Sequence, residues 1–275
     1  MTTDTNRPAP TAPLTPEERA AQKRVRTEAM RAEYRHELDV PYGTHSKQVL
    51  DIYHPKQATS APVLVFLHGG GFRNGAPGAE GYVGRGVLEH GGMFVAMGYR
   101  LLPDAPYPDS CDDVELGLRW LTEHIAAHGG DPARIFLSGT SAGASLAAAV
   151  ALRPWAAEPA LPGDVVQGLV LFSGRYDRTE EDIKFDNSAA ARYVQHLSRS
   201  IERTPPHTVV VTTVEESAFP DVPDNAAAIT AAIKAHGGSV ERLVQAYADH
   251  FSSSRSLAEG SGAIFEAVRR MMQLS

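Results

Sequence analysis

The sequence predicts an α/β protein with a mainly parallel sheet and helices on both of its faces. The uninterrupted apolar runs Pro62–Leu67 and Gly92–Met97 are typical of strands that are covered on both faces. Helical patterns lie between these runs, and strands that alternate with helices favour a parallel sheet. The third observation is an apolar run, a turn of small residues and an Ala-rich stretch, which follow one another over residues 134–152. This succession predicts a strand, a tight turn and a helix.

Composition sets the broad class of the protein. The chain has 275 residues, of which 43% are hydrophobic, so it can bury a substantial core. Its formal charge of −7 comes without a basic stripe, which argues against a nucleic-acid surface. Cys111 is the only cysteine, so no intrachain disulfide can form, and this suits a reducing compartment. We expect a cytoplasmic protein with no membrane partner, because we find neither a signal-peptide core in residues 1–16 nor an apolar stretch of roughly 18 residues.

The N-terminal segment 1–16 is rich in Pro and Thr and predicts a disordered tail, which leaves residues 17–275 as a single domain. Thr15 as an N-cap, followed by Pro16 and two acids, predicts a helix that runs to about Tyr34. Two interpretations of this helix stay open. It is either a strap on the surface or part of a cap over a functional site.

The remaining elements follow in order along the chain. Two segments with alternating hydrophobicity, 37–40 and 48–53, predict a β-hairpin that is joined through Tyr42 and Gly43. Further strands are expected at 62–67, 92–97, 134–138, 165–172, 208–214 and 239–246. Helices are expected at 81–90, 111–128, 142–152, 224–236 and 258–272.

Ser141 is the first candidate functional residue. It is the centre of the pentapeptide Gly-Thr-Ser-Ala-Gly at 139–143, between the strand predicted at 134–138 and the helix that begins at Ala142. Small residues two before and two after the serine let the backbone turn sharply, which pushes the hydroxyl out over the sheet edge. The helix directs its free N–H groups and the positive end of its dipole toward an approaching oxygen. These features predict a nucleophilic serine.

A serine nucleophile needs a base, and His250 has the best position in the chain. It follows the strand predicted at 239–246, and the loops after the carboxyl ends of parallel strands meet at one edge of a sheet. We therefore expect His250 to reach Ser141. His124 and His128 have helical i, i+4 spacing but lack the glutamate of a zinc-protease helix, so no metal site and no cofactor are predicted.

The base in turn needs a carboxylate that fixes its tautomer, and the order serine, acid, histidine places this acid at a late strand end. Glu215 is the first choice, because the strand at 208–214 delivers it directly to the sheet edge. Glu216 is the alternative, and Asp221 is the third candidate. Asp224 is expected to be the N-cap of the next helix instead.

The strand at 62–67 ends in His68 and three consecutive glycines. Glycine permits backbone geometries that a Cβ would forbid, so the N–H groups of this loop can approach an oxygen closely. We expect the amides of Gly70, Gly71 and Ala142 to form an oxyanion hole. A phosphate-binding loop is the other interpretation of a glycine run, but the Lys-Ser/Thr and G-x-G-x-x-G patterns are absent.

At these residues the chain resembles the α/β-hydrolase superfamily, over roughly residues 40–272. His68–Gly71 resembles the HGGG motif of the hormone-sensitive-lipase-like carboxylesterases. Residues 99–113 resemble the family's YRLAPE segment and paired aspartates, and residues 130–143 resemble its approach to the nucleophile. The resemblance implies an eight-stranded sheet with a small helical cap, and a serine hydrolase that works without a cofactor.

A second branch of the superfamily, the kynurenine formamidases, is similar in other segments. These are residues 40–43, 50–55, 173–177, 215–219 and 249–251. Formamidases typically carry an aromatic residue in place of Gly71 and an aspartate as the acid, and the lipase-like branch carries glycine where Ala144 stands. The resemblance places cap elements at 17–36 and about 175–205. Phe72 and Phe251 flank the oxyanion loop and the base, and we expect them to line the substrate pocket.

The sequence thus predicts a serine hydrolase that cleaves a small carboxylic ester through an acyl-enzyme intermediate. An arylformamidase that cleaves an N-formyl amide is the closest alternative. A non-catalytic ligand-binding member of the fold is a second alternative. The expected partner is a small ester or amide, and a homodimer stays open.

Overall fold

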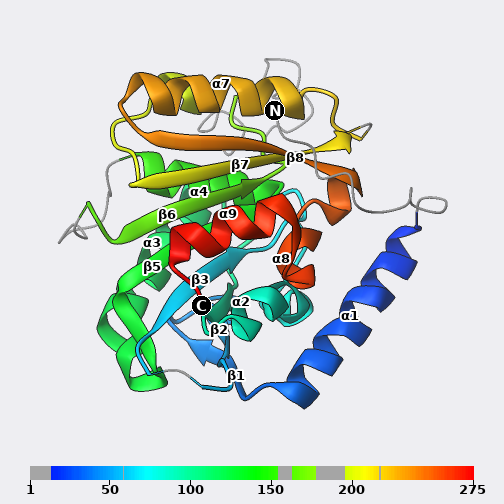
Figure 1. Ribbon diagram of the computed structural model, residues 1–275, viewed down its shortest axis with the longest axis vertical. Coiled ribbons are helices and arrows are strands. Elements are labelled where there is room, and N and C mark those ends of the chain that lie inside the picture. The colour runs from blue at the N-terminus through cyan, green and yellow to red at the C-terminus, as the bar shows by residue number, and fades with distance from the viewer. Residues whose placement is uncertain (1–13, 58, 154–162, 178–195, 217) are drawn as a thin grey trace.

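The computed structural model describes residues 14–57, 59–153, 163–177, 196–216 and 218–275. An eight-stranded sheet forms its centre, with the strand order β1-β2-β4-β3-β5-β6-β7-β8 (Figure 1). β1 (His36–Pro41) and β2 (Val49–Tyr53) form the predicted antiparallel hairpin, and β2 pairs antiparallel with β4. The other strands run parallel: β3 (Ala61–Leu67), β4 (Met93–Met97), β5 (Gly130–Thr140), β6 (Val166–Phe172), β7 (His207–Glu215) and β8 (Ser239–Asp249). The predicted α/β class with a mainly parallel sheet is confirmed.

Helices cover both faces of this sheet (Figure 1). The longer ones are α1 (Pro16–Glu33), α3 (Tyr107–His124), α4 (Ala142–Leu152), α7 (Val222–Ala235) and α9 (Gly262–Met272), and the short ones are α2 (Arg85–Glu89) and α8 (Arg255–Glu259). Single 3₁₀ turns lie at η1 (Pro77–Ala79), η2 (Gly81–Gly84), η3 (Ile125–His128), η4 (Leu197–Arg199) and η5 (His250–Ser252). Within the described part of the chain, no helix combines the length and hydrophobicity that crossing a bilayer requires.

The core consists of two layers, one on each side of the sheet. Alternate residues of β3 belong to different layers, with Val65 in one and Phe66 in the other, and every residue of β3 is buried. Leu146 of α4 packs in the first layer and Phe265 of α9 in the second. The central strands are therefore covered on both faces, as their uninterrupted apolar runs predict.

Three predicted helices differ from the structure in detail. The segment predicted at 81–90 consists of the 3₁₀ turn η2 and the single turn of α2, and the helix predicted at 258–272 is divided between α8 and α9. Gly260 ends α8 in the left-handed region at φ 60°, which a continuous helix cannot contain. The prediction of Asp224 as an N-cap is wrong: α7 begins at Val222 after Asp221, and Asp224 lies in its first turn.

Helix α1 is fixed at both ends and along its length. The Thr15 hydroxyl accepts the N–H of Glu18, whose carboxylate accepts the N–H of Thr15, so the predicted start has reciprocal capping bonds. Lys23 then forms an ion pair of 2.6 Å with the buried carboxylate of Glu80 beside η2. Arg31 reaches Asp51 of β2 at 3.3 Å. These contacts hold α1 against the rim of the fold.

Candidate active site

Ser141 lies on a sharp turn between β5 and α4. Its backbone has φ 53° and ψ −119°, a left-handed conformation that is strained for a residue with a Cβ. A Cβ on Gly139 would lie 2.4 Å from the backbone of Gly143, and a Cβ on Gly143 would lie 2.1 Å from the carbonyl oxygen of Leu67. Both flanking glycines are therefore required by contact as well as by the turn. The serine side chain is left at the carboxyl edge of the sheet.

The imidazole of His250 lies between Ser141 and a buried carboxylate. Its Nε2 is 2.9 Å from Ser141 Oγ, and its Nδ1 is 2.9 Å from Glu216 Oε2. His250 begins η5 directly after β8, where Ser252 exchanges hydrogen bonds with Asp249 and fixes the turn. The ring is only 3% exposed, so its two hydrogen bonds form away from bulk water. The structure thus brings Ser141 and His250 together, as their positions after the strands predict.

The carboxylate that meets His250 belongs to Glu216, the alternative acid, and not to the first choice, Glu215. Glu215 is the last residue of β7, where it still pairs with Asp249 of β8 after an irregularity in the register. Glu216 is the first residue after β7, so the strand pairing of β7 with β8 does not fix the direction of its backbone. The sequence alone places both residues at the sheet edge, and only the register separates them. We correct the first choice from Glu215 to Glu216 on this geometry.

Glu216 is held in its charged form by a set of donors. Burial opposes its ionisation, but hydrogen bonds from His250, the Ser173 hydroxyl (2.5 Å) and the N–H of Thr213 (3.1 Å) outweigh burial and lower the pKa of this carboxyl. Ser173 follows β6 directly and has φ 47°. A charged Glu216 fixes the Nδ1–H tautomer of His250, which leaves the Nε2 lone pair directed at Ser141.

The glycine loop after β3 lies against the turn that carries Ser141. A Cβ on Gly69 would lie 3.3 Å from the Cβ of Ser141, so the two loops are in contact. Gly70 has φ 123°, and a Cβ there would lie 2.0 Å from the carbonyl oxygen of Asn74, whereas Gly71 has φ 62° and open space around it. The loop therefore has the backbone freedom that donors aimed at a substrate oxygen need. The amides of Gly70, Gly71 and Ala142 stay a predicted oxyanion hole.

His68 fixes the glycine loop through a hydrogen bond to the loop backbone. Its Nδ1–H donates to the carbonyl oxygen of Gly69 at 2.7 Å, and its ring stacks on Tyr99 with centroids 4.3 Å apart. The Tyr99 hydroxyl donates to the carbonyl oxygen of His68 at 2.6 Å. Burial lowers the pKa of His68 to about 4, so the imidazole stays neutral at physiological pH. His68 is thus a positioning residue, and its ring does not carry a charge toward the site.

Two aromatic rings flank the imidazole of His250. Phe219 lies with its ring centroid 4.4 Å away, and Phe251 meets the imidazole edge-on at 5.5 Å. Phe251 is 50% exposed, which suits the predicted role in a substrate pocket. Phe72 is different, since it is 2% exposed and packs edge-on against Tyr107 in the core. Phe72 therefore packs in the core, and its contact with substrate stays a prediction.

The other acids and histidines considered from sequence have partners elsewhere. Asp221 pairs with Arg175 at 2.7 Å, and His128 pairs with Glu37 at 3.0 Å. The Nδ1 of His124 lies 2.9 Å from the carbonyl oxygen of Trp120. Within the described ranges, no cluster of three or more His, Cys, Asp or Glu side chains is arranged to hold a metal ion.

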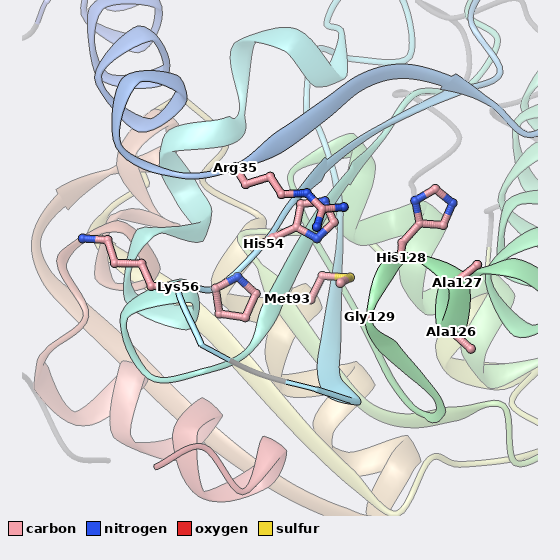
Figure 2. Close-up of a pocket in the computed structure, with 9 residues that line it drawn as sticks. Arg35, His54, Lys56, Met93, Ala126, Ala127, His128 and Gly129 are labelled. Atoms are coloured by element: carbon pink, nitrogen blue, oxygen red, sulfur yellow. The ribbon is translucent and has the colours of Figure 1, made fainter.

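A cavity of about 470 Å³ lies at the other end of the sheet and is not part of this site (Figure 2). Met93 and Gly129 line it where β4 and β5 begin, whereas Ser141 follows the end of β5. The Arg35 guanidinium lies beside the His54 ring, and the Lys56 side chain points away from both. We place the chemistry at the opposite edge, because the hydrogen-bonded serine, histidine and glutamate are there.

Sequence reasoning missed Ser173 and Phe219 as residues of this site. Ser173 directly follows the apolar run predicted as a strand at 165–172, so its position at the sheet edge was available from the sequence. Its bond to Glu216 was not, because it joins two strand ends in space. Phe219 lies in a turn closed by its own N–H to the carbonyl oxygen of Glu216 at 2.9 Å, and no periodic pattern announces such a turn.

The second predicted cap element, about 175–205, lies mostly outside the described residues. The structure describes residues 175–177 and 196–205 of it. Asp177 forms an isolated bridge with His196, and the hydroxyl of Ser198 bonds the Asp177 carboxylate. The disordered tail predicted at 1–16 also lies outside the described residues as far as residue 13.

An eight-stranded α/β sheet with a serine, a histidine and an acid at its carboxyl edge is the arrangement of an α/β hydrolase. Residues 64–204 match the alpha/beta hydrolase fold family, and this region runs from β3 through Ser141 to η4. The chain belongs to this family. Glu216 and His250 lie beyond the matched region, so their place in the site comes from the coordinates.

Individual relatives agree with this assignment. The chain is 39% identical over 98 residues to carboxylesterase NlhH of Mycobacterium tuberculosis, an alignment that covers 35% of this chain and 31% of NlhH. It is 34% identical over 142 residues to tuliposide A-converting enzyme b1 of Tulipa gesneriana, which covers 45% of this chain and 36% of that enzyme. The chain thus spans about a third of the length of these curated relatives. Esterase B of Lactobacillus rhamnosis has the same fold, with a TM-score of 0.68, 18% identity and coverage of 94% of this chain and 96% of that chain.

Proposed function

We propose that this protein is a serine hydrolase that cleaves small carboxylic esters through an acyl-enzyme intermediate. The observation that carries the proposal is the continuous line of hydrogen bonds from Ser141 Oγ through His250 to Glu216, with both contacts at 2.9 Å. The name of NlhH, a carboxylesterase, supports an ester as the substrate. A small acyl or alcohol group suits a site in which the base is nearly enclosed.

In the first half of the reaction Ser141 Oγ attacks the carbonyl carbon of the ester. Its proton moves to His250 Nε2 as the new C–O bond forms, and the carbonyl electrons collect on oxygen. The C–O bond to the leaving group then breaks, and the leaving oxygen takes the proton from Nε2. Glu216 keeps its charge throughout and stabilises the imidazolium, a role that suits its lowered pKa.

In the second half a water molecule replaces the alcohol. His250 Nε2 takes a proton from the water as its oxygen attacks the acyl carbon, and the same nitrogen returns a proton to Ser141 Oγ when the acyl–serine bond breaks. Each half passes through an oxyanion, for which we propose the amides of Gly70, Gly71 and Ala142 as donors. Loss of one such donor typically costs roughly 10²–10³ in turnover.

The experiment that tests the proposal compares three purified full-length proteins. Wild type should hydrolyse p-nitrophenyl acetate and should react with a fluorophosphonate probe at a single site. Ser141→Ala should lose both properties while keeping the far-UV circular dichroism of wild type. Ser200→Ala is the matched control, because the Ser200 hydroxyl donates to the backbone carbonyl oxygens of His196 and Leu197 at η4, and it should behave as wild type. Wild-type turnover in Ser141→Ala, or an unlabelled wild type, would refute the nucleophile.

The same proteins test the two alternative functions. The proposed steps suit an N-formyl aryl amide as well as an ester, since His250 can protonate a leaving amine in the same way. Hydrolysis of N-formylkynurenine by wild type at a higher kcat/KM than any short acyl ester would replace the esterase proposal with a formamidase. Binding of a small ligand without turnover or fluorophosphonate labelling would indicate a non-catalytic member of the fold.

A further inference from the structure

Each ring beside His250 also has an arginine close to it. The guanidinium of Arg175 lies 5.8 Å from the centroid of Phe219, and that of Arg19 lies 4.2 Å from the centroid of Phe251. Phe219 and Phe251 both contact the imidazole. The proposed base is therefore flanked by two aromatic rings, and each ring has a cation beside it.

The two arginines differ in their partners. Arg175 forms an ion pair with Asp221 at 2.7 Å, so a carboxylate already offsets its charge. Arg19 donates to the carbonyl oxygen of Leu14 and forms no ion pair within residues 14–57, 59–153, 163–177, 196–216 and 218–275. The guanidinium has five N–H donors in a planar fork, and among the described residues only Leu14 accepts a hydrogen bond from them. Arg19 thus brings to the ring of Phe251 a positive charge that no ion pair with a described residue offsets.

The position of Arg19 is fixed by the anchoring of its helix. The capping bonds at Thr15, the pair of Lys23 with the buried Glu80 and the contact of Arg31 with Asp51 hold α1 on both sides of Arg19. The guanidinium stacks over the ring of Phe251, and this contact does not use the N–H groups at the edge of the guanidinium plane. An arginine held in this way is suited to bidentate recognition of a carboxylate.

The side of the substrate that this carboxylate occupies follows from the proposed chemistry. His250 protonates the leaving atom, so the leaving group must lie close to His250 Nε2 when the C–O bond breaks. Phe251 directly follows His250 and is 50% exposed, so its ring offers apolar surface beside that position. A group attached to the leaving atom would extend along this ring toward Arg19.

We propose that Arg19 and Phe251 select esters whose leaving group is an aromatic alcohol with a negative charge, such as a hydroxybenzoate. The proposal rests on the proposed serine hydrolase activity and deepens it. Phe251 contributes apolar contact with the aryl group, and Arg19 contributes the charge-assisted hydrogen bonds to its carboxylate. The alternative is that Arg19 only fastens α1 to the turn after β8, in which case it would influence every substrate equally.

The test uses pairs of acetate esters that differ only in the charge of the leaving group. Purified full-length protein is assayed on 3- and 4-acetoxybenzoate and on the corresponding uncharged acetoxybenzamides, with the uncatalysed rates subtracted. In Arg19→Gln the ratio of kcat/KM between the charged and uncharged esters should fall about tenfold, mainly through KM, for at least one of the two isomers. Arg19→Lys should keep part of the preference. Arg24→Gln, on an exposed part of the same helix, is the matched control and should keep all of it.

Three results would overturn the proposal. An unchanged ratio in Arg19→Gln for both isomers would remove Arg19 from substrate recognition. A parallel loss on charged and uncharged esters, together with a lower melting temperature, would assign it the fastening role alone. If wild type hydrolyses none of the four esters and no p-nitrophenyl acetate, the serine hydrolase proposal fails first, and this result is distinct from the other two.

Discussion

Replacing the carboxylate of Glu216 by an amide tests the hydrogen-bonded relay of Ser141, His250 and Glu216 at the acid, the residue that the sequence identified least clearly. In Glu216→Gln the side chain keeps its shape but loses its charge and one acceptor of the hydrogen bonds from His250, Ser173 and Thr213. The variant no longer stabilises the imidazolium and no longer favours the Nδ1–H tautomer, so the Nε2 lone pair is not reliably directed at Ser141. Turnover should therefore fall, whereas the fold should persist.

The size of the effect follows from the distance between the charges. With His250 Nδ1 and Glu216 Oε2 2.9 Å apart, the centres of the two charges are ~4 Å apart, and at an effective dielectric constant of ~20 their attraction is about 4 kcal/mol. Each ~1.4 kcal/mol is a factor of ten in rate, so kcat should fall about 10³-fold. The assay is the steady-state hydrolysis of p-nitrophenyl acetate at pH 8, with thermal melting as the test of folding.

Glu215→Gln is the matched control for this prediction. It removes a carboxylate from the adjacent residue, at the end of the β7 ladder, and should change kcat by less than about threefold, because the carboxylate that contacts His250 belongs to Glu216. A fall of less than tenfold in Glu216→Gln would refute the reasoning. So would a collapse of turnover in Glu215→Gln with Glu216→Gln active, since Glu215 would then be the acid that supports His250.

Two further predictions concern Ser173 and His68, which bond to Glu216 and to the glycine loop. In Ser173→Ala the pKa of Glu216 should rise, because a hydrogen-bond donor to its charged form is lost. The acid limb of the pH profile of kcat/KM should therefore move to higher pH, and kcat should fall about tenfold. An acid limb that does not move would contradict this role of Ser173. Burial lowers the pKa of His68 from 6.5 to about 4, so between these pH values the unfolded state binds more protons than the folded state. The free energy of unfolding should therefore fall by roughly 3 kcal/mol as the pH drops from 6.5 to 4. His68→Asn keeps a donor for the loop carbonyl and should flatten this dependence in urea unfolding at pH 7.0 and 4.5, whereas parallel losses in both proteins would exclude His68 as its source.

The parts of the site that could be predicted from sequence are those fixed by strand order. Ser141 and His250 each follow an apolar strand closely, and the carboxyl ends of parallel strands meet at one edge whatever the details of the loops. The choice between Glu215 and Glu216 depends on a single residue of register in the β7–β8 ladder, which hydrophobic periodicity does not resolve. Register and turn geometry are cooperative properties of two strands, so neither segment contains them alone.

Contacts between distant segments were beyond prediction for a different reason. Arg19 is near the start of the chain and Phe251 near its end, and their meeting depends on how α1 is anchored to η1, η2 and β2. The sequence shows a helix with a thin apolar stripe, and such a pattern is compatible with many positions on a surface. The specific position comes from buried charge, above all the pair of Lys23 with Glu80, whose burial no periodicity reveals.

Two residues with strained backbone lie at the carboxyl edge of the sheet. Ser141 follows β5 at φ 53° and Ser173 follows β6 at φ 47°, two left-handed conformations that cost of order 1–3 kcal/mol each for residues with a Cβ. Their amides donate to the neighbouring strands, from Ser141 to Phe172 and from Ser173 to Val211, at 2.8 Å in both cases. These bonds to the sheet therefore hold both turns in their strained conformations. The same bonds place the Ser141 hydroxyl at His250 and the Ser173 hydroxyl at Glu216. Since relaxation of either turn would separate the hydroxyl from its partner, the strained edge and the hydrogen-bonded relay are one structural feature.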